Sequence, residues 1–221
     1  MIRSWFRDHT APRWLALALW AATPAGAASN PAADAPAAAA VDSTSPIAFL
    51  RAHDRQVTAL VGSPGDSLAP AVRRQVRELI NGVFDFEELS RLSLGDFWEP
   101  RTPEERREFV AVYRGIIEQQ NLDRFVKYYR EGKFQYRSEE VEGQRATVHA
   151  VLPLQNEEMA ITYLLLRPGG AMGWRVYDLV IDGTSTAEVN QRSYARYIRR
   201  NSYEKLVEQL RSQLAKLADP S

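Results

Sequence analysis

Two carboxylates stand four residues apart at the end of a hydrophobic stretch, Asp178 and Asp182. If this stretch is a β-strand, alternation of side chains places both on one face. A pair of this kind could supply the general acid and the general base of a hydrolase. The simpler interpretation is that Asp178 meets an arginine or a backbone N–H, while Asp182 occupies the turn before Gly183. We therefore predict no catalytic residue in this segment.

Other groups that could do chemistry are scarce. Gly183-Thr184-Ser185 lacks the Gly-x-Ser-x-Gly nucleophile elbow because Ala187 stands where the second glycine should be, and Ser185 is better explained as a helix N-cap. His149 falls in an expected strand and is interpreted as a packed or edge residue; beyond the first 27 residues only His53 could serve as another base. No His, Asp and Glu residues recur at metal-ligand spacing, so we expect neither a metal nor a cofactor, and no enzyme activity.

The overall composition narrows the function further. The formal net charge is +0, which argues against a nucleic-acid-binding protein that relies on phosphate contacts. The chain has no cysteine, so no disulfide stabilises it, and its stability must come from the core.

The N-terminal residues have the features of a secretory signal peptide. Three arginines precede a short apolar run, Trp14 to Ala22, and small residues follow at Ala25-Gly26-Ala27. The run is shorter than the roughly 20 residues that span a bilayer. We expect a signal peptide over 1–27 with cleavage after Ala27, a flexible Ala/Pro-rich linker over 28–44, and one domain over 45–218.

Helical periodicity dominates the first half of this domain. Thr102, Pro103 and Glu105 form the clearest helix start, and Asp85 with Glu88 resembles a capping box. Near Asn121 the apolar set of the long helix shifts, which predicts a bend or register change. The expected apolar faces are Ile47, Leu50, Val57, Leu60 and Val61; Leu68, Val72, Val76, Leu79, Ile80 and Val83; Phe86, Leu89 and Leu92; and Phe109, Val112, Tyr113, Ile116 and Ile117, followed by Leu122, Phe125, Val126 and Tyr129.

After Gly132 the period changes to two. Strands are expected around Phe134–Arg137, Arg145–Leu152, Met159–Arg167 and Gly173–Asp182, joined by hairpin turns into a four-stranded antiparallel meander. Two helices then end the chain, the second capped by Ser202. N-terminal helices, a sheet and C-terminal helices indicate the α+β class.

The last two strands are apolar on both faces. Strict alternation places Trp174, Val176 and Val180 with Asp178 on one face, and Tyr177, Leu179 and Ile181 on the other. A sheet with one wetted face should alternate more cleanly. Either helices or a bound apolar ligand must cover each side.

Three blocks of the sequence share a characteristic order and spacing. They are Trp174-Arg175-Val176-Tyr177-Asp178 with Gly183-Thr184-Ser185 and Tyr194; Phe84 to Trp98 with Thr102-Pro103-Glu104 and Phe109; and Tyr203-Glu204-Lys205-Leu206. Together these blocks resemble the MlaC, or toluene-tolerance, family of periplasmic phospholipid-binding proteins, and the resemblance spans roughly residues 45–215.

The resemblance implies an NTF2-like fold with an apolar cavity between sheet and helices. It implies a periplasmic carrier, not an enzyme, that shuttles phospholipid between an outer-membrane lipoprotein complex and an inner-membrane ABC-type transporter, and so maintains outer-membrane lipid asymmetry. Acyl chains would be the cargo, no cofactor is implied, and we expect a monomer. The expected ligand-binding residues are Phe109, Tyr113, Ile116, Tyr163, Leu165, Trp174 and Val176.

Two segments depart from the family pattern. Thr186-Ala187-Glu188 and Asn190-Gln191 replace residues common in the family, which leaves the pocket mouth and its lipid preference open. An NTF2-like hydrolase or isomerase, an adaptor with a filled interior, and a carrier of another apolar lipid such as a hopanoid precursor remain alternatives.

Overall fold

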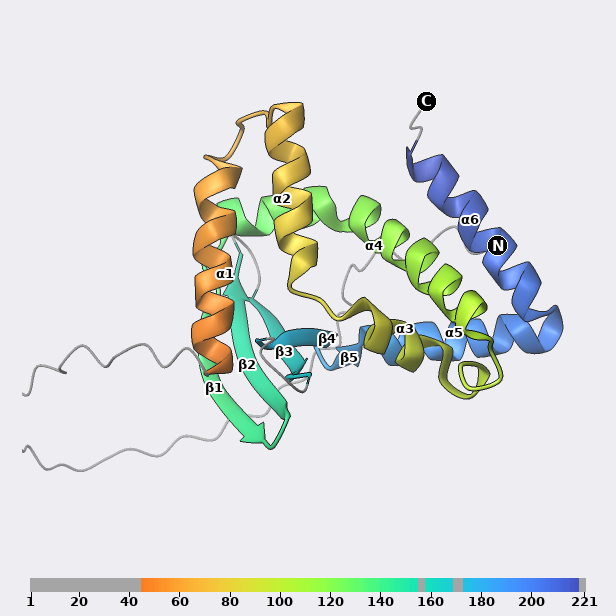
Figure 1. Cartoon of the computed structure of the whole chain (residues 1–221). Helices are drawn as coiled ribbons and strands as arrows, with labels where there is room; N and C mark the ends of the chain where they lie inside the picture. The colour runs from red at the N-terminus through yellow and green to blue at the C-terminus, as the bar shows by residue number, and fades with distance from the viewer. Residues whose placement is uncertain (1–44, 155–157, 169–172, 219–221) are drawn as a thin grey trace, which may run out of the picture. The chain divides into compact units, whose positions relative to one another are not determined.

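The computed structural model describes residues 45–154, 158–168 and 173–218. The expected signal peptide and linker lie outside these residues. The helices and strands are α1 Pro46–Val61, α2 Pro70–Gly82, α3 Phe86–Leu94, the 3₁₀ turn η1 Gly95–Phe97, α4 Pro103–Glu131, β1 Gln135–Glu142, β2 Arg145–Pro153, β3 Glu158–Leu166, β4 Arg175–Ile181, β5 Thr184–Ser185, α5 Thr186–Arg200 and α6 Tyr203–Ala218 (Figure 1). This order confirms the predicted α+β class.

The helix starts follow local sequence rules. Thr102 Oγ1 accepts a hydrogen bond from the Glu105 backbone N–H (3.2 Å), and the Glu105 carboxylate accepts one from the Thr102 N–H (2.8 Å), which completes a capping box. Asp85, Ser185 and Ser202 cap α3, α5 and α6 through the same type of contact.

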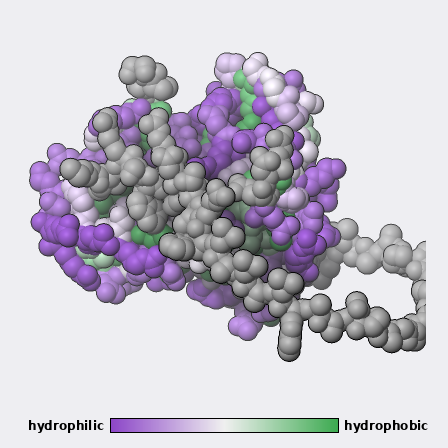
Figure 2. Space-filling view, turned by 180° about the vertical axis from the view of Figure 1, so that it is seen from behind, coloured by the Kyte–Doolittle hydropathy of each residue, from purple (hydrophilic) through white to green (hydrophobic). Residues whose placement is uncertain are grey.

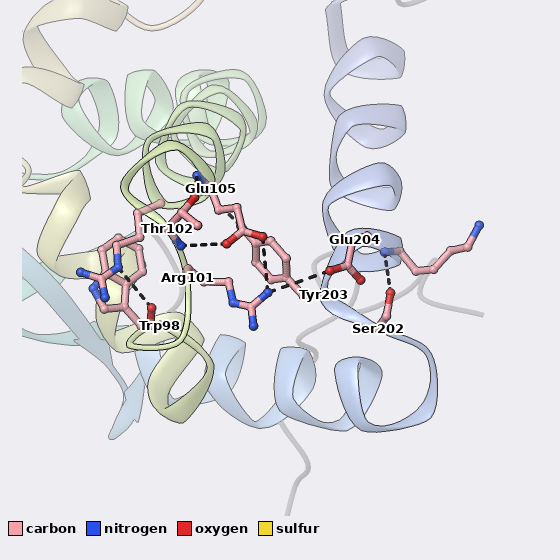
Figure 3. A network of polar contacts seen from close by, with 9 residues as sticks. Trp98, Arg101, Thr102, Glu105, Ser202, Tyr203 and Glu204 are labelled. Carbon is pink, nitrogen blue, oxygen red and sulfur yellow. Dashed lines mark hydrogen bonds and ion pairs between the residues drawn. The ribbon is translucent and has the colours of Figure 1, made fainter.

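The starts of α4 and α6 lie side by side (Figure 3). Arg101 stacks over the Tyr203 ring at 4.6 Å from its centroid and pairs with Glu105 (3.5 Å) and Glu204 (4.0 Å). The Tyr203 hydroxyl donates to the Glu105 carbonyl at 3.0 Å. These contacts fix the crossing of the two helices.

The sheet is an antiparallel meander in the order β1-β2-β3-β4-β5. The prediction of four strands omitted β5, a two-residue strand that pairs with the end of β4. Asp182 (φ 48°) and Gly183 (φ 77°) form the connecting turn, and two successive positive φ angles are the signature of a type I′ hairpin. Asp182 therefore occupies the turn position expected of it.

A β-bulge changes which residues of β4 share a face. Leu164 pairs with Asp178 and the next residue, Leu165, pairs with Val176, so Tyr177 has no partner on β3. Val176 consequently lies on the same face as Leu179, in one core cluster with it. The predicted grouping of Val176 with Asp178 is wrong because strict alternation does not hold through a bulge.

The core falls into distinct clusters of buried side chains. One lies between α1 and the sheet and contains Leu50, Val148, Leu165, Trp174 and Val176. A second joins α1 and α2 to the C-terminal half of α4, and a third joins α3, α5 and α6 to its N-terminal half. Helix α4 is continuous through residue 121, and the shift of its apolar set moves it from one cluster to the other.

The surface of the described residues is largely polar. Val141 and Ile181 are the large hydrophobic side chains exposed on it, and hydrophilic residues make up most of the coloured surface in Figure 2. Among the helices of residues 45–154, 158–168 and 173–218, none combines the length and hydrophobicity that a membrane span requires.

Candidate functional site

An apolar cavity lies between the helices and the inner face of the sheet. Its volume is about 40 Å³. Its walls come from α1, α2 and the residues after it, the end of α4, and strands β3 and β4; they are Leu50, His53, Asp54, Ile80, Val83, Phe84, Phe125, Tyr128, Tyr129, Phe134, Met159, Ile161, Tyr163, Leu179 and Ile181. Ile181 is 36 % exposed, so the cavity approaches the surface at the end of β4.

Strand geometry explains the sheet wall. Met159, Ile161 and Tyr163 alternate along β3 and point to the helices. Leu179 and Ile181 stand opposite Tyr163 and Ile161 on β4, and they reach the same face because the bulge precedes them. The wall would be lost if β4 kept strict alternation from Val176.

One polar cluster interrupts this apolar lining. The Asp54 carboxylate accepts a hydrogen bond from the Tyr136 hydroxyl at 2.6 Å and from the Tyr129 hydroxyl at 2.9 Å. Tyr163 packs beside the cluster, since its ring centroid lies 6.2 Å from that of Tyr136. His53 Nε2 lies 3.0 Å from the Leu79 carbonyl, a distance at which it donates.

Burial controls the protonation of these tyrosines. Removal from water raises the pKa of Tyr129, Tyr136 and Tyr163 well above the ordinary value for tyrosine, and the nearby Asp54 carboxylate raises each further. The hydroxyls therefore remain hydrogen-bond donors at physiological pH. The cluster holds the Asp54 carboxylate in place through two hydroxyl donors.

A larger groove of about 460 Å³ lies on the surface between the α1–α2 connection and α4. Its lining is charged, and the Arg73–Asp123 pair (2.8 Å) and the Lys127–Glu131 pair (3.7 Å) balance their charges locally. A groove with such walls does not suit an apolar ligand.

The candidate catalytic groups have structural partners. Asp178 is 3 % exposed and accepts hydrogen bonds from Ser185 Oγ (2.6 Å), the Leu179 N–H (2.9 Å) and the Ala187 N–H (3.0 Å). Asp182 accepts one from the Ala160 N–H at 3.0 Å. His149 is exposed and hydrogen-bonded to Thr162, but it lies on β2 between β1 and β3, so the expectation of a packed or edge residue is wrong.

No group of three or more His, Cys, Asp and Glu side chains within the described residues is arranged to hold a metal ion.

The family model described as "MlaC protein" matches residues 54–212. The chain belongs to the MlaC family. A similar solved structure is a phospholipid-binding protein from Ralstonia solanacearum in complex with a phospholipid, with 22% sequence identity and a TM-score of 0.65. The match covers 78% of this MlaC-family chain and 98% of that chain, which shows a shared fold. No curated protein matches the sequence.

The structure separates the residues predicted to bind ligand in this MlaC-family protein into three places. Tyr163 lines the cavity. Leu165, Trp174 and Val176 lie in the adjacent core cluster under α1, which shares Leu50 and Val83 with the cavity wall.

The remaining three predicted residues lie elsewhere, in the cluster of α3, α4, α5 and α6: Phe109, Tyr113 and Ile116. The rings of Phe109 and Tyr113 stack at 5.6 Å, and Tyr194 packs edge-on against both. Contact of these residues with a ligand stays a prediction, as does the NTF2-like comparison.

Sequence reasoning missed the helical half of the cavity. Phe125 and Tyr129 follow the register shift in α4, which marks the part of that helix that faces the sheet. His53 and Asp54 interrupt the apolar stripe of α1, and a polar pair within such a stripe could have indicated a special environment.

Proposed function

We propose that this MlaC-family protein is a non-enzymatic carrier of phospholipid that holds acyl chains in the cavity between α1, α4 and the sheet. The observation that carries the proposal is a cavity lined by apolar and aromatic side chains in a chain of this family. The similar structure from Ralstonia solanacearum holds a phospholipid, which supports the same ligand class here.

The energetics of acyl chains favour a carrier of this design. Two acyl chains contain roughly 30 methylenes, and their exposure to water costs on the order of 20 kcal/mol at ~0.8 kcal/mol each. Transfer between a bilayer and an apolar cavity is close to neutral, because both hide the chains. A carrier therefore needs a dry cavity and no catalytic group.

The cavity must widen before it accepts this cargo. Its volume of about 40 Å³ provides room for only a few water molecules. Pockets for small ligands typically measure about 300–1,000 Å³. We infer that the described conformation is closed and that lipid entry separates the helices from the sheet.

Extraction of the purified mature protein with organic solvent tests the proposal. Mass spectrometry of the extract should find phospholipid in stoichiometric amount, and delipidated protein should take up lipid from vesicles. An empty extract together with failure to take up lipid would contradict the proposal.

We also propose that the chain works in the periplasm, after cleavage behind Ala27, between an inner-membrane ABC-type transporter and an outer-membrane lipoprotein complex. The N-terminal sequence pattern and the family membership support this placement. N-terminal sequencing of the protein from a periplasmic fraction, and crosslinking in intact cells, test the two parts separately. A mature N-terminus at Met1 would contradict export by this route.

A further inference from the structure

A chain of hydrogen bonds crosses the cavity wall from the helices to the sheet. Tyr129 of α4 donates to Asp54 of α1, and Tyr136 of β1 donates to the other carboxylate oxygen. The ring of Tyr163, on β3, packs against the ring of Tyr136 with their centroids 6.2 Å apart. Side chains of α1, α4 and β1 thus meet at one carboxylate.

The hydrogen bond between Asp54 and Tyr136 differs from the one between Asp54 and Tyr129, because it links a helix to the sheet. Asp54 and Tyr129 both belong to the helical wall, so the bond between them does not cross the cavity boundary. Tyr136 belongs to the sheet, although it does not line the cavity, and its bond of 2.6 Å to Asp54 joins the helical wall to the sheet. Figure 1 shows α1 lying alongside β1 and β2, where this contact is made.

A second polar contact joins the same two elements at the start of α1. The Glu139 carboxylate of β1 accepts hydrogen bonds from Ser45 Oγ (2.9 Å) and from the Ile47 N–H (2.7 Å). It therefore satisfies backbone and cap groups at the helix N-terminus, where negative charge is favoured. This contact positions α1 on the edge strand and aligns Asp54 with Tyr136.

Polar contacts suit a junction that has to open. When two walls separate, water can replace both partners of a hydrogen bond, so the separated groups are not left unsatisfied. A hydrogen bond to a charged group changes the ratio of closed to open protein about ten- to hundredfold.

We propose that Asp54 is the residue that keeps the cavity closed, and that release of Tyr136 from Asp54 is the step that admits and discharges acyl chains. The inference rests on the proposed carrier function. It assigns Asp54 a positioning role: its carboxylate holds the sheet against the helices and need not touch the lipid.

The test is the rate at which loaded protein delivers a fluorescent phosphatidylethanolamine to vesicles of phosphatidylethanolamine and phosphatidylglycerol. Tyr136→Phe removes the bond between the walls without emptying space, and transfer should accelerate about tenfold.

Tyr203→Phe provides a matched control away from the cavity. It removes a hydroxyl that donates to the Glu105 carbonyl at 3.0 Å, where α4 meets α6. Its thermal stability should fall about as much as that of Tyr136→Phe, whereas its transfer rate should stay within about twofold of the unaltered protein. This comparison separates a role in closure from general destabilisation.

Several results would overturn the inference. Equal transfer rates for Tyr136→Phe, Tyr203→Phe and the unaltered protein would mean that the bond between Tyr136 and Asp54 serves only stability. Slower transfer by Tyr136→Phe would mean that this bond promotes transfer, the opposite of the inference. If Tyr136→Phe does not fold, Asp54→Asn decides, because it removes the charge and one acceptor; an unchanged rate again rejects the inference. Unaltered protein that retains no lipid would instead reject the carrier function on which the inference depends.

Discussion

Replacement of Asp178 by alanine should destabilise the protein without removing its ligand. The carboxylate is 3 % exposed and accepts three hydrogen bonds, from Ser185 Oγ and from the backbone N–H groups of Leu179 and Ala187. Alanine leaves at least the buried Ser185 and Ala187 donors without an acceptor, at about 1–3 kcal/mol each. We expect a loss of about 4 kcal/mol in the free energy of unfolding, or roughly 12 °C in Tm for a chain of this size.

Asp178→Asn separates the hydrogen bonds from the charge. Asparagine keeps one acceptor oxygen for the backbone donors and loses only the acceptor for Ser185 Oγ, so we expect a loss of about 1–2 kcal/mol. Urea unfolding followed by circular dichroism measures both variants against the unaltered protein.

The pH dependence of Asp178 has a definite sign. Burial raises the pKa of this carboxyl above its ordinary value of 3.8, while the hydrogen bonds from Ser185, Ala187 and Leu179 oppose the shift. Because the folded state then binds the proton more tightly, the contribution of Asp178 to stability is greatest below pH 3.8 and falls as the pH rises through the raised folded-state pKa. The difference in stability between the unaltered protein and Asp178→Asn should decline over that window, by at most about 1.4 kcal/mol per pH unit.

Two results would refute this reasoning. An alanine variant within about 1 kcal/mol of the unaltered protein would mean that the three contacts contribute little. A well-folded Asp178→Asn variant that lost its lipid would give the carboxylate a functional role and revive the enzyme alternative.

Further predictions concern the cavity and its frame. Ile161→Trp should fill the cavity and abolish lipid retention with the fold intact, whereas Phe109→Ala should cost about 3–5 kcal/mol in stability yet retain lipid. Solvent extraction measures the retained lipid of each variant, and thermal unfolding measures its stability. Loss of lipid in Phe109→Ala but not in Ile161→Trp would place the ligand between α3 and α6. Gly132→Ala should lower Tm, because an added Cβ would lie 2.9 Å from the Pro153 carbonyl oxygen; an unchanged Tm would show that the α4–β1 junction adjusts freely. Thr102→Ala should lose about 1 kcal/mol through its capping box, and urea unfolding with no change would contradict that.

Features set by local chemistry could be predicted from the sequence. Thr102, Asp85, Ser185 and Ser202 all cap helices as expected, because an N-cap depends on a few neighbouring residues. The meander order was equally accessible, since successive strands joined by short turns pair with their neighbours.

The face assignment of β4 failed for a physical reason. A bulge needs only one extra residue, and nothing in the composition around Tyr177 distinguishes it from a regular strand. The short strand β5 was within reach, because Asp182-Gly183 is a strong signal for a two-residue hairpin.

The cavity was harder to predict because its walls come from segments far apart in the chain. Tyr163 followed from the apolar pattern of β3, but Leu50 of α1, Phe84 of the α2–α3 connection and Phe125 of α4 reach the cavity only through tertiary packing. Periodicity identifies the apolar face of a helix and does not say which of two neighbouring clusters that face enters. The two halves of α4 enter different clusters, and periodicity alone does not distinguish them. Phe109 was therefore predicted to bind ligand, although it lies in the cluster of α3, α5 and α6.

The outer edge of the sheet bears on how the protein behaves at high concentration. Strand β1 has one unpaired side, which could template the addition of a strand from another molecule. It carries the exposed Glu140 and Glu142, so two copies aligned edge to edge would bring carboxylates together and repel. The acidic residues on the outer edge of β1 should therefore discourage fibril growth and self-association through this edge. A strand that added to this edge would need basic side chains opposite these carboxylates.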